Sequence, residues 1–331
     1  MNLKKSELFF VIRSIKNHFI HTITASKYYS EKYKRLGKLK IFLIRFFYSF
    51  YFIRNLIGYN NKLKNVFEEN IFIKGENSKD IIKEIIEKGY YKTCIKSEIV
   101  DLIVDDFKKN NFEYGLKPFF KDLDKKTGKY IIKEEKIAIP RNINLNEILE
   151  YSNKQNLYHV SISILPKLQS EISKISQSPF FLNIAKSYLN SEKIILRPHC
   201  IISNSFSVDV ETKKKNAQFF HYDADYKKFF KVFIYLNDVG QDNGPHTFVQ
   251  KTHKKKKLRH SHAERIHDEE IIKFYGEENI KTFVGKKGTI IFEDTFGFHK
   301  GQPPISKSRL MLVLEYGLPP GIGDEGIYKI E

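Results

Sequence analysis

Hydrophobic and polar residues follow two different periods in the two halves of this chain. In residues 78–89, apolar side chains at 81, 82, 85 and 86 lie on one face of a helix. Ser78 is placed to cap the start of this helix, and Gly89 is placed to end it. The same pattern predicts three further helices, over residues 97–109, 165–176 and 178–190.

From residue 193 onward, short runs with a period of two are separated by turn residues, as is typical of β-strands. The sequence Asp-Asn-Gly-Pro at 242–245 is one such turn. A helical half followed by short strands predicts an α+β protein with an antiparallel jelly-roll core and helices packed outside it. The expected strands cover residues 90–95, 193–210, 217–223, 228–238, 246–250, 289–294 and 309–316, whereas residues 116–143 have no regular pattern.

The first 65 residues differ in composition from the rest of the chain. They hold 14 Lys or Arg and only two Glu, and so carry most of the net charge of +18. We therefore expect a basic, aromatic helical extension over residues 1–65, followed by one domain over residues 66–331. Within this domain, the helical half is expected over 66–190 and the jelly-roll core over 191–318.

Residues 38–58 are both aromatic and basic. Arg45 and Arg54 interrupt the apolar runs, so no run approaches the roughly 20 residues needed to span a bilayer. No small-residue cleavage site of a signal peptide follows them. Two alternatives remain: a helix lying on anionic lipid at the cytoplasmic face of a membrane, or a helix packed on the domain.

Composition also bounds the cellular setting and the partners. Cys94 and Cys200 lie far apart in the sequence and form neither a metal-ligand pair nor a disulfide framework, which fits a reducing, cytoplasmic setting. Only nine Arg accompany the many Lys, and charge alone is weak support for a phosphate-reading surface. We therefore expect no nucleic-acid partner.

The candidate chemistry begins in the stretch QFFHYDADYKKFF at 218–230. In a strand, alternate side chains face the same way, so His221 and Asp223 project together, roughly 7 Å apart along the backbone. Phe220 and Tyr222 would then face the opposite layer. This spacing allows both polar side chains to bind one metal ion. Asp225 is the alternative carboxylate, but its spacing from the histidine suits a helix rather than a strand.

A third ligand and an anion-binding residue follow further along the chain. His299 lies just past the strand expected at 289–294, and two His with one carboxylate form the facial triad of non-haem Fe(II) oxygenases. Arg309 opens the last strand and shares its face with Met311 and Val313, where it can bind a carboxylate such as that of 2-oxoglutarate.

Structural roles are the alternatives for each of these residues. His221 could be a hydrogen-bonded core histidine. Arg309 could form an ion pair with Glu293 or Asp294. His246, which follows the turn at 242–245, could face the pocket or have a structural or surface role. The charge run at 251–262 could close over an anionic substrate as a lid or be a solvated loop.

In this order, His221-x-Asp223, His299 and Arg309 resemble the metal and co-substrate set of the phytanoyl-CoA dioxygenase family. The segments KVFIYLNDVGQDNGPHTFVQKTHK and GTIIFEDTFGFHKG resemble core strands of that family, and IIEKGYYKT and SPFFLNIAKSYL resemble its helical half. The resemblance covers about residues 70–318 and is dense from residue 190 onward.

The resemblance implies a double-stranded β-helix, Fe(II) and 2-oxoglutarate, with His221, Asp223 and His299 binding iron and Arg309 anchoring the C5 carboxylate of 2-oxoglutarate. It implies O₂-dependent oxidation of a small-molecule or lipid- or glycan-linked substrate, with release of succinate and CO₂. Related halogenases have a small residue in place of the carboxylate, so Asp223 favours hydroxylation.

The chain departs from the family pattern at several positions. Gly301 stands where many relatives have a Ser that contacts 2-oxoglutarate. The segment QKTHKK replaces the family motif Pro-Gly-Ser-His, and His253 is its matching histidine. On the strand before His221, Asn204 or Ser205 is the candidate for a further 2-oxoglutarate contact.

Two other functional classes remain open. One is a jelly-roll binding module that keeps the fold and the metal but has lost the chemistry. The other is a metal-dependent hydrolase, since two His and one carboxylate also bind zinc. Hydrolysis, however, would give Arg309 no role.

Overall fold

The computed structural model describes the part of the chain that follows the expected N-terminal extension. The extension at 1–65, with the two alternatives for residues 38–58, therefore lies outside the described residues. Within the described part, no helix combines the length and the apolar character needed to cross a membrane. The described residues are 72–73, 75–109, 112–117, 122–123, 130–131, 142–154, 159–164, 170–205, 218–223, 226, 228–260, 265–318 and 328–330.

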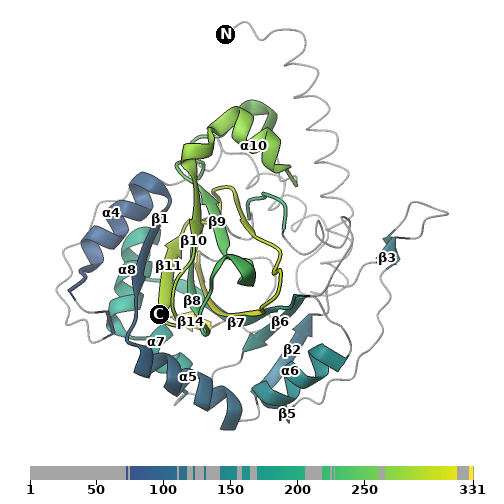
Figure 1. Ribbon diagram of the computed structural model, residues 1–331. Coiled ribbons are helices and arrows are strands. Elements are labelled where there is room, and N and C mark those ends of the chain that lie inside the picture. Colours follow the sequence, from purple (N-terminus) through teal and green to yellow (C-terminus); the bar gives the residue numbers. More distant parts are fainter. Residues whose placement is uncertain are drawn as a thin grey trace, which may run out of the picture.

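A large antiparallel sheet forms the main layer of the molecule (Figure 1). Its strands run in the order β1-β11-β8-β13-β7-β6-β2-β5, and β14 pairs with β7 as well. These strands are β1 (Tyr90–Cys94), β2 (Phe112–Lys117), β5 (Asn142–Ile143), β6 (His159–Ile164), β7 (Ile194–Ser203), β8 (Phe229–Tyr235), β11 (Thr289–Glu293), β13 (Arg309–Gly317) and β14 (Tyr328–Ile330).

A smaller antiparallel sheet faces the large one. It consists of β10 (Ile280–Phe283), β9 (His246–Val249) and β12 (His299–Gly301), in that order. Phe248 and Phe283 from this sheet pack in one buried cluster with Phe233 and Val313 from the large sheet. Two antiparallel sheets closed around a shared interior form the jelly roll that the sequence predicted. A separate pair joins β3 (Asp122–Leu123) and β4 (Tyr130–Ile131).

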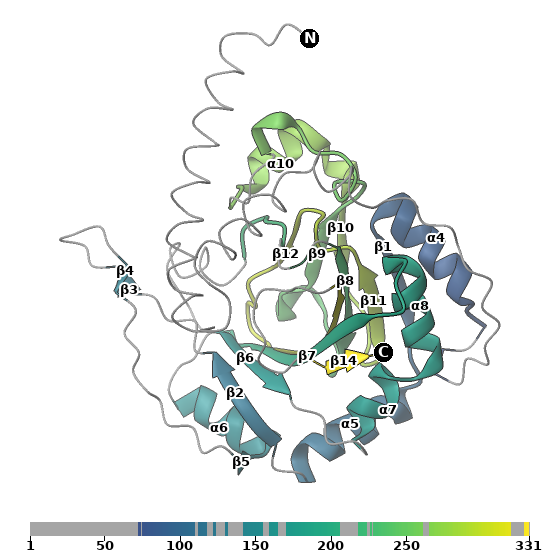
Figure 2. The same cartoon turned by 180° about the vertical axis from the view of Figure 1, so that it is seen from behind.

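The helices pack on the outer face of the large sheet. In Figures 1 and 2, α4, α5, α7 and α8 lie outside the barrel, and α10 lies beyond one of its ends. Leu312 and Leu314 of β13 face these helices, whereas Met311 and Val313 face the interior, as predicted. The helices are α4 (Ser78–Lys88), α5 (Ser97–Lys109), α6 (Leu145–Lys154), α7 (Glu171–Ser176), α8 (Pro179–Leu189) and α10 (Asp268–Tyr275).

Several local expectations need correction. The side chain of Asn77, rather than Ser78, caps α4 by accepting a hydrogen bond from the Asp80 N–H at 3.0 Å. Gly89 ends this helix with φ of 95°, as expected. Residues 116–143, expected to be irregular, contain short strands, and β6 and β10 were not predicted.

The strand predicted over residues 217–223 is wrong as a continuous strand. Its described part makes two isolated bridges, Phe220 with Ile266 and His221 with His299. Successive residues thus pair with segments on opposite sides, as in a central strand, but each pairing is a single bridge rather than a ladder. This double pairing brings the two histidines together.

Candidate functional site

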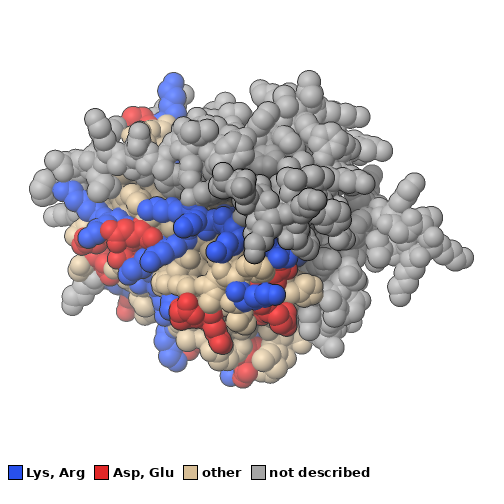
Figure 3. Space-filling model, turned by 90° about the horizontal axis from the view of Figure 1, so that it is seen from above, with Lys and Arg blue, Asp and Glu red and all other residues tan. Residues whose placement is uncertain are grey.

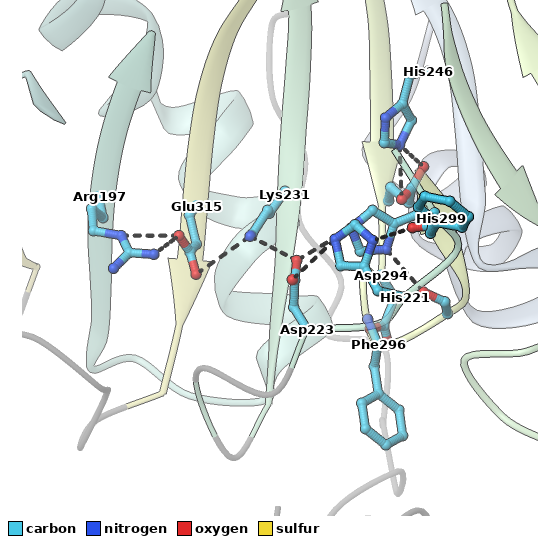
Figure 4. A network of polar contacts seen from close by, with 12 residues as sticks. Arg197, His221, Asp223, Lys231, His246, Asp294, Phe296, His299 and Glu315 are labelled. Carbon is cyan, nitrogen blue, oxygen red and sulfur yellow. Dashed lines mark hydrogen bonds and ion pairs between the residues drawn. The ribbon is translucent and has the colours of Figure 1, made fainter. Parts of the chain in front are cut away.

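His221, Asp223 and His299 converge at one point of the barrel interior. Their ligand atoms all lie within 4.8 Å of one another (Figure 4). Nε2 of His299 lies 3.4 Å from the Asp223 carboxylate, and Nε2 of His221 lies 3.9 Å from it. The structure thus assembles three residues that the sequence had separated by up to 78 positions. Among the described residues, this is the cluster of His, Cys, Asp or Glu side chains arranged to hold a metal ion.

Backbone hydrogen bonds fix the geometry of this cluster. His221 and His299 exchange both N–H···O bonds, with N···O distances of 3.0 and 2.8 Å. The Asp223 N–H donates to the Thr295 carbonyl at 2.9 Å. All three Cα positions are therefore held before any ligand binds. Such preorganisation is needed for a metal site of defined geometry.

The two imidazoles are oriented by their own local backbone. Nδ1 of His221 lies 3.0 Å from the Phe219 carbonyl, and Nδ1 of His299 lies 3.0 Å from the Gly297 carbonyl. A carbonyl only accepts, so each Nδ1 must carry the proton and donate. Each Nε2 then presents its lone pair to the centre of the cluster, as metal-bound histidines do.

Electrostatics favour the protonation states that a cation requires. Burial lowers the pKa of both His221 and His299, which keeps the imidazoles neutral. Burial alone would raise the pKa of Asp223, but the Lys231 charge, the two neighbouring imidazoles and the hydrogen bond from Lys231 together outweigh it, and the pKa lies well below its usual value. Two neutral imidazoles and one carboxylate fit Fe(II), which needs deprotonated ligands.

A row of charged side chains supports Asp223 from the large sheet. Lys231 of β8 donates to Asp223 at 2.8 Å, and its Nζ lies 3.9 Å from Glu315 of β13. Glu315 in turn accepts from Nε of Arg197 on β7 at 3.0 Å (Figure 4). Strand register places these three residues side by side. The carboxylate of Asp223 is thus held by a cation on a rigid strand.

His246 and Glu293 form a second buried polar pair close to the cluster. Nε2 of His246 lies 2.9 and 3.1 Å from the two carboxylate oxygens of Glu293, and its ring centroid lies 5.7 Å from that of His299. Burial lowers the pKa of His246 to about 3 and raises that of Glu293 to about 8. At neutral pH the pair therefore shares one proton and has no net charge. A surface role for His246 is wrong.

Arg309 is buried at the far end of the interior. It donates to the carbonyl oxygen of Gly244 and, at 3.3 Å, to Oγ of Ser203, its partner in the β13–β7 register. A Cβ at Gly301 would lie 2.7 Å from Nη2 of Arg309. Glycine at this position, where many relatives have Ser, therefore leaves the space that the guanidinium occupies.

The ion pairs considered as alternatives for Arg309 involve carboxylates with other partners. Glu293 binds His246, and Asp294 accepts from the hydroxyl of Tyr188 at 2.6 Å.

Asn204 lies one residue beyond the β7 position that contacts Arg309. Its amide donates to Oγ of Ser152 at 3.3 Å, and its carbonyl accepts from Oγ of Ser308 at 2.9 Å. Ser203 is instead the β7 residue beside Arg309. A contact between Asn204 and a co-substrate stays a prediction.

His159 is a further, half-buried neighbour of this end of the interior. Its Nδ1 lies 3.5 Å from Oγ of Ser203. Burial, together with the Arg309 charge, lowers the pKa of His159 to about 4. Sequence reasoning missed Ser203 and His159 because only the pairing of β6, β7 and β13 brings them to Arg309.

The described part of the charge run at 251–262 packs against the back of the cluster. Nζ of Lys256 donates to the carbonyl oxygens of Thr252 and Phe296 and lies 3.8 Å from the centroid of the Phe296 ring. His253 is buried, with Nε2 3.0 Å from the Ile86 carbonyl. A solvated loop is therefore wrong for these two side chains, which anchor the insertion between β9 and β10.

Comparison with known proteins gives a family match over the same region. The model of the family described as phytanoyl-CoA dioxygenase (PhyH) matches residues 167–310, a segment that includes all five predicted site residues, Asn204 among them. No curated protein sequence matches the chain.

Several solved structures are similar to this chain at low identity, each with a TM-score under 0.5. The epimerase SnoN in complex with Fe³⁺, α-ketoglutarate and nogalamycin RO is 12% identical, with a TM-score of 0.46, over 77% of this chain and 98% of that one. EctD from S. alaskensis, with 2-oxoglutarate and 5-hydroxyectoine, is 13% identical, with a TM-score of 0.44, over 78% and 81%. HygX from Streptomyces hygroscopicus, with nickel and 2-oxoglutarate, is 12% identical, with a TM-score of 0.42, over 73% and 87%.

Proposed function

We propose that this chain, in which residues 167–310 form a phytanoyl-CoA dioxygenase family domain, is an Fe(II)- and 2-oxoglutarate-dependent oxygenase that hydroxylates a small-molecule or lipid- or glycan-linked substrate. One observation carries the proposal. Two neutral imidazoles and a charged carboxylate converge within 4.8 Å in the same interior that holds a buried arginine. The two imidazoles and the carboxylate suit iron, and the arginine suits the carboxylate of a co-substrate.

His221, Asp223 and His299 would hold the metal, and Arg309 would hold the distal carboxylate of 2-oxoglutarate. When bound, Fe(II) and 2-oxoglutarate supply, with O₂, the oxidation of a substrate C–H bond to C–OH, while 2-oxoglutarate becomes succinate and CO₂. Three protein ligands would leave further coordination positions of the metal open, as such a site requires.

The other residues of the chain orient these ligands. Lys231 holds the Asp223 carboxylate, and the Phe219 and Gly297 carbonyls hold the two imidazole rings. Apolar side chains of the interior cluster, among them Phe233 and Met311, exclude bulk water between the two sheets. The His246–Glu293 pair places two polar side chains beside the cluster without adding net charge.

Substitution of Asp223 tests this function directly. Asp223→Ala removes the carboxylate ligand, and we expect it to abolish succinate formation from 2-oxoglutarate while the protein stays folded by circular dichroism. Full turnover in this variant would contradict the proposal. Iron and 2-oxoglutarate binding without any succinate in the wild type would favour the binding module instead, and oxygen-independent turnover would favour a hydrolase.

Hydroxylation is distinguished from other outcomes by oxygen labelling. With ¹⁸O₂, a hydroxylated product retains one labelled oxygen atom, whereas inversion of a carbon centre adds none. We expect the label in the product. Stoichiometric succinate with an unlabelled product would show that the chain uses the same cofactors for a different reaction.

A further inference from the structure

Arg265 lies next to His221 across a pair of antiparallel extended segments. Phe220 and Ile266 exchange both backbone hydrogen bonds, at 3.1 and 2.8 Å. The adjacent residues of such a pair are opposite each other without hydrogen bonds, and there the side chains come closest and share a face. Ile266 packs with Phe220 in one apolar cluster, so Arg265 and His221 share the other face, on the side of the metal ligands.

The charge of Arg265 acts on these ligands. It contributes to the lowered pKa of His221, and the Asp223 charge in turn acts to raise the pKa of Arg265. Burial outweighs this effect and brings the pKa of Arg265 to about 10, so the side chain stays charged. Among the described residues, none accepts a hydrogen bond from its Nη1, although this nitrogen is shielded from solvent.

Metal binding would remove the charge that balances Arg265. A divalent cation on Asp223 neutralises that carboxylate, whose other oxygen already accepts from Lys231 at 2.8 Å. The guanidinium would then lie on the side of the metal with no anion of its own. The distal carboxylate of 2-oxoglutarate does not supply one, since Arg309 at the far end of the interior provides its partner.

We propose that Arg265 binds an oxyanion of the substrate, a carboxylate or a phosphate, and thereby holds the substrate beside the metal. The inference rests on the proposed function and narrows its substrates to anionic molecules. A guanidinium offers a planar pair of donors that matches both groups. Exposed Lys251, Lys255 and Lys257 belong to the same insertion and attract anions. Figure 3 shows Lys and Arg side chains together with Asp and Glu on the face seen from above.

A metal-free experiment tests the anion site by itself. Asp223→Asn removes the same negative charge that a bound metal would neutralise. We expect inorganic phosphate, and separately acetate, to raise the melting temperature of metal-free Asp223→Asn protein. Addition of Arg265→Gln should abolish the shift, and addition of Arg265→Lys, which keeps the charge, should retain part of it. Equal shifts with and without Arg265→Gln would overturn the inference.

Arg259→Gln is the matched control. Arg259 lies in the same insertion, in the short helix η2 (Leu258–His260), and its Nη2 lies 2.8 Å from Glu270. It thus has a carboxylate partner on α10. The phosphate-induced shift should survive this substitution, and its loss here would assign anion binding to the insertion as a whole rather than to Arg265.

A second experiment places the anion relative to the metal. In wild-type protein loaded with Mn(II) and 2-oxoglutarate, the ³¹P relaxation of phosphate should be enhanced saturably by the paramagnetic ion. Arg265→Gln should weaken the apparent phosphate affinity at least tenfold and leave 2-oxoglutarate loading unchanged. A higher 2-oxoglutarate requirement in Arg265→Gln would show that Arg265 contacts the co-substrate, which would overturn the inference. Absence of Mn(II) binding would overturn the proposed function, while the metal-free experiment would still decide the role of Arg265.

Discussion

Replacing Lys231 with Met removes the cation that lies between Asp223 and Glu315. Lys231 donates to Asp223 at 2.8 Å, and the two side chains are only 11% and 18% exposed. Met keeps most of the apolar volume and cannot carry a charge. The carboxylate of Asp223 would then be buried without its ion-pair partner, whereas Glu315 would retain Arg197.

Loss of one partner of a buried ion pair destabilises a protein by about 3–5 kcal/mol. We expect Lys231→Met to lower the free energy of unfolding of the metal-free protein by about this amount. A divalent cation compensates Asp223 in place of the lysine, so the deficit should shrink when Mn(II) is saturating. Urea denaturation with and without Mn(II) measures both quantities.

Lys286→Met is the control for this experiment. Lys286 also pairs with a carboxylate at 2.9 Å, but its side chain is 87% exposed, and exposed pairs contribute about 0–1 kcal/mol. If Lys231→Met destabilised the protein no more than this control, or if its deficit were unchanged by Mn(II), the electrostatic coupling between Lys231 and the metal site would be refuted.

Three further predictions follow from the described contacts. Arg309→Leu removes the donors for the distal carboxylate of 2-oxoglutarate. It should raise the 2-oxoglutarate concentration needed for half-maximal turnover on the order of tenfold or more, since a hydrogen bond to a charged group contributes about 1.5–3 kcal/mol. The metal affinity should stay unchanged, which is the control. Gly301→Ala places a Cβ 2.7 Å from Nη2 of Arg309 and should raise the same requirement by displacing the guanidinium; an unchanged requirement would contradict this geometry. Burial lowers the pKa of His253 to about 4, so its contribution to stability is present above about pH 6.5 and is lost as the pH falls toward 4. His253→Asn should therefore show a shallower loss of stability over this interval, by up to about 1.4 kcal/mol per pH unit, and parallel urea-unfolding profiles for variant and wild type would contradict it.

Local patterns in the sequence predict well which side chains share a face, because the relevant spacing is short. A period of two places His221 and Asp223 on one face and Phe220 with Tyr222 on the other, and the structure shows this division. The pattern cannot show that residue 221 pairs with residue 299 while residue 220 pairs with residue 266, since both partners are distant in the chain.

The charged row beside the site could not be predicted from the sequence. Lys231, Glu315 and Arg197 lie on three adjacent strands, and each looks like an isolated charge in an apolar run. Only the register of the sheet sets opposite charges side by side.

At helix ends the ambiguity is local instead. Asn77 and Ser78 are both good capping residues, and periodicity cannot distinguish between neighbouring residues.

The most direct test of the central claim is an anaerobic titration of the metal-free protein with Fe(II) and then with 2-oxoglutarate, followed by visible absorption. We predict the charge-transfer band of a chelated Fe(II)–2-oxoglutarate complex in the wild type, its loss in Asp223→Ala, and a higher 2-oxoglutarate requirement in Arg309→Ala. Stoichiometric, tight Fe(II) binding with no band at any 2-oxoglutarate concentration would contradict the account.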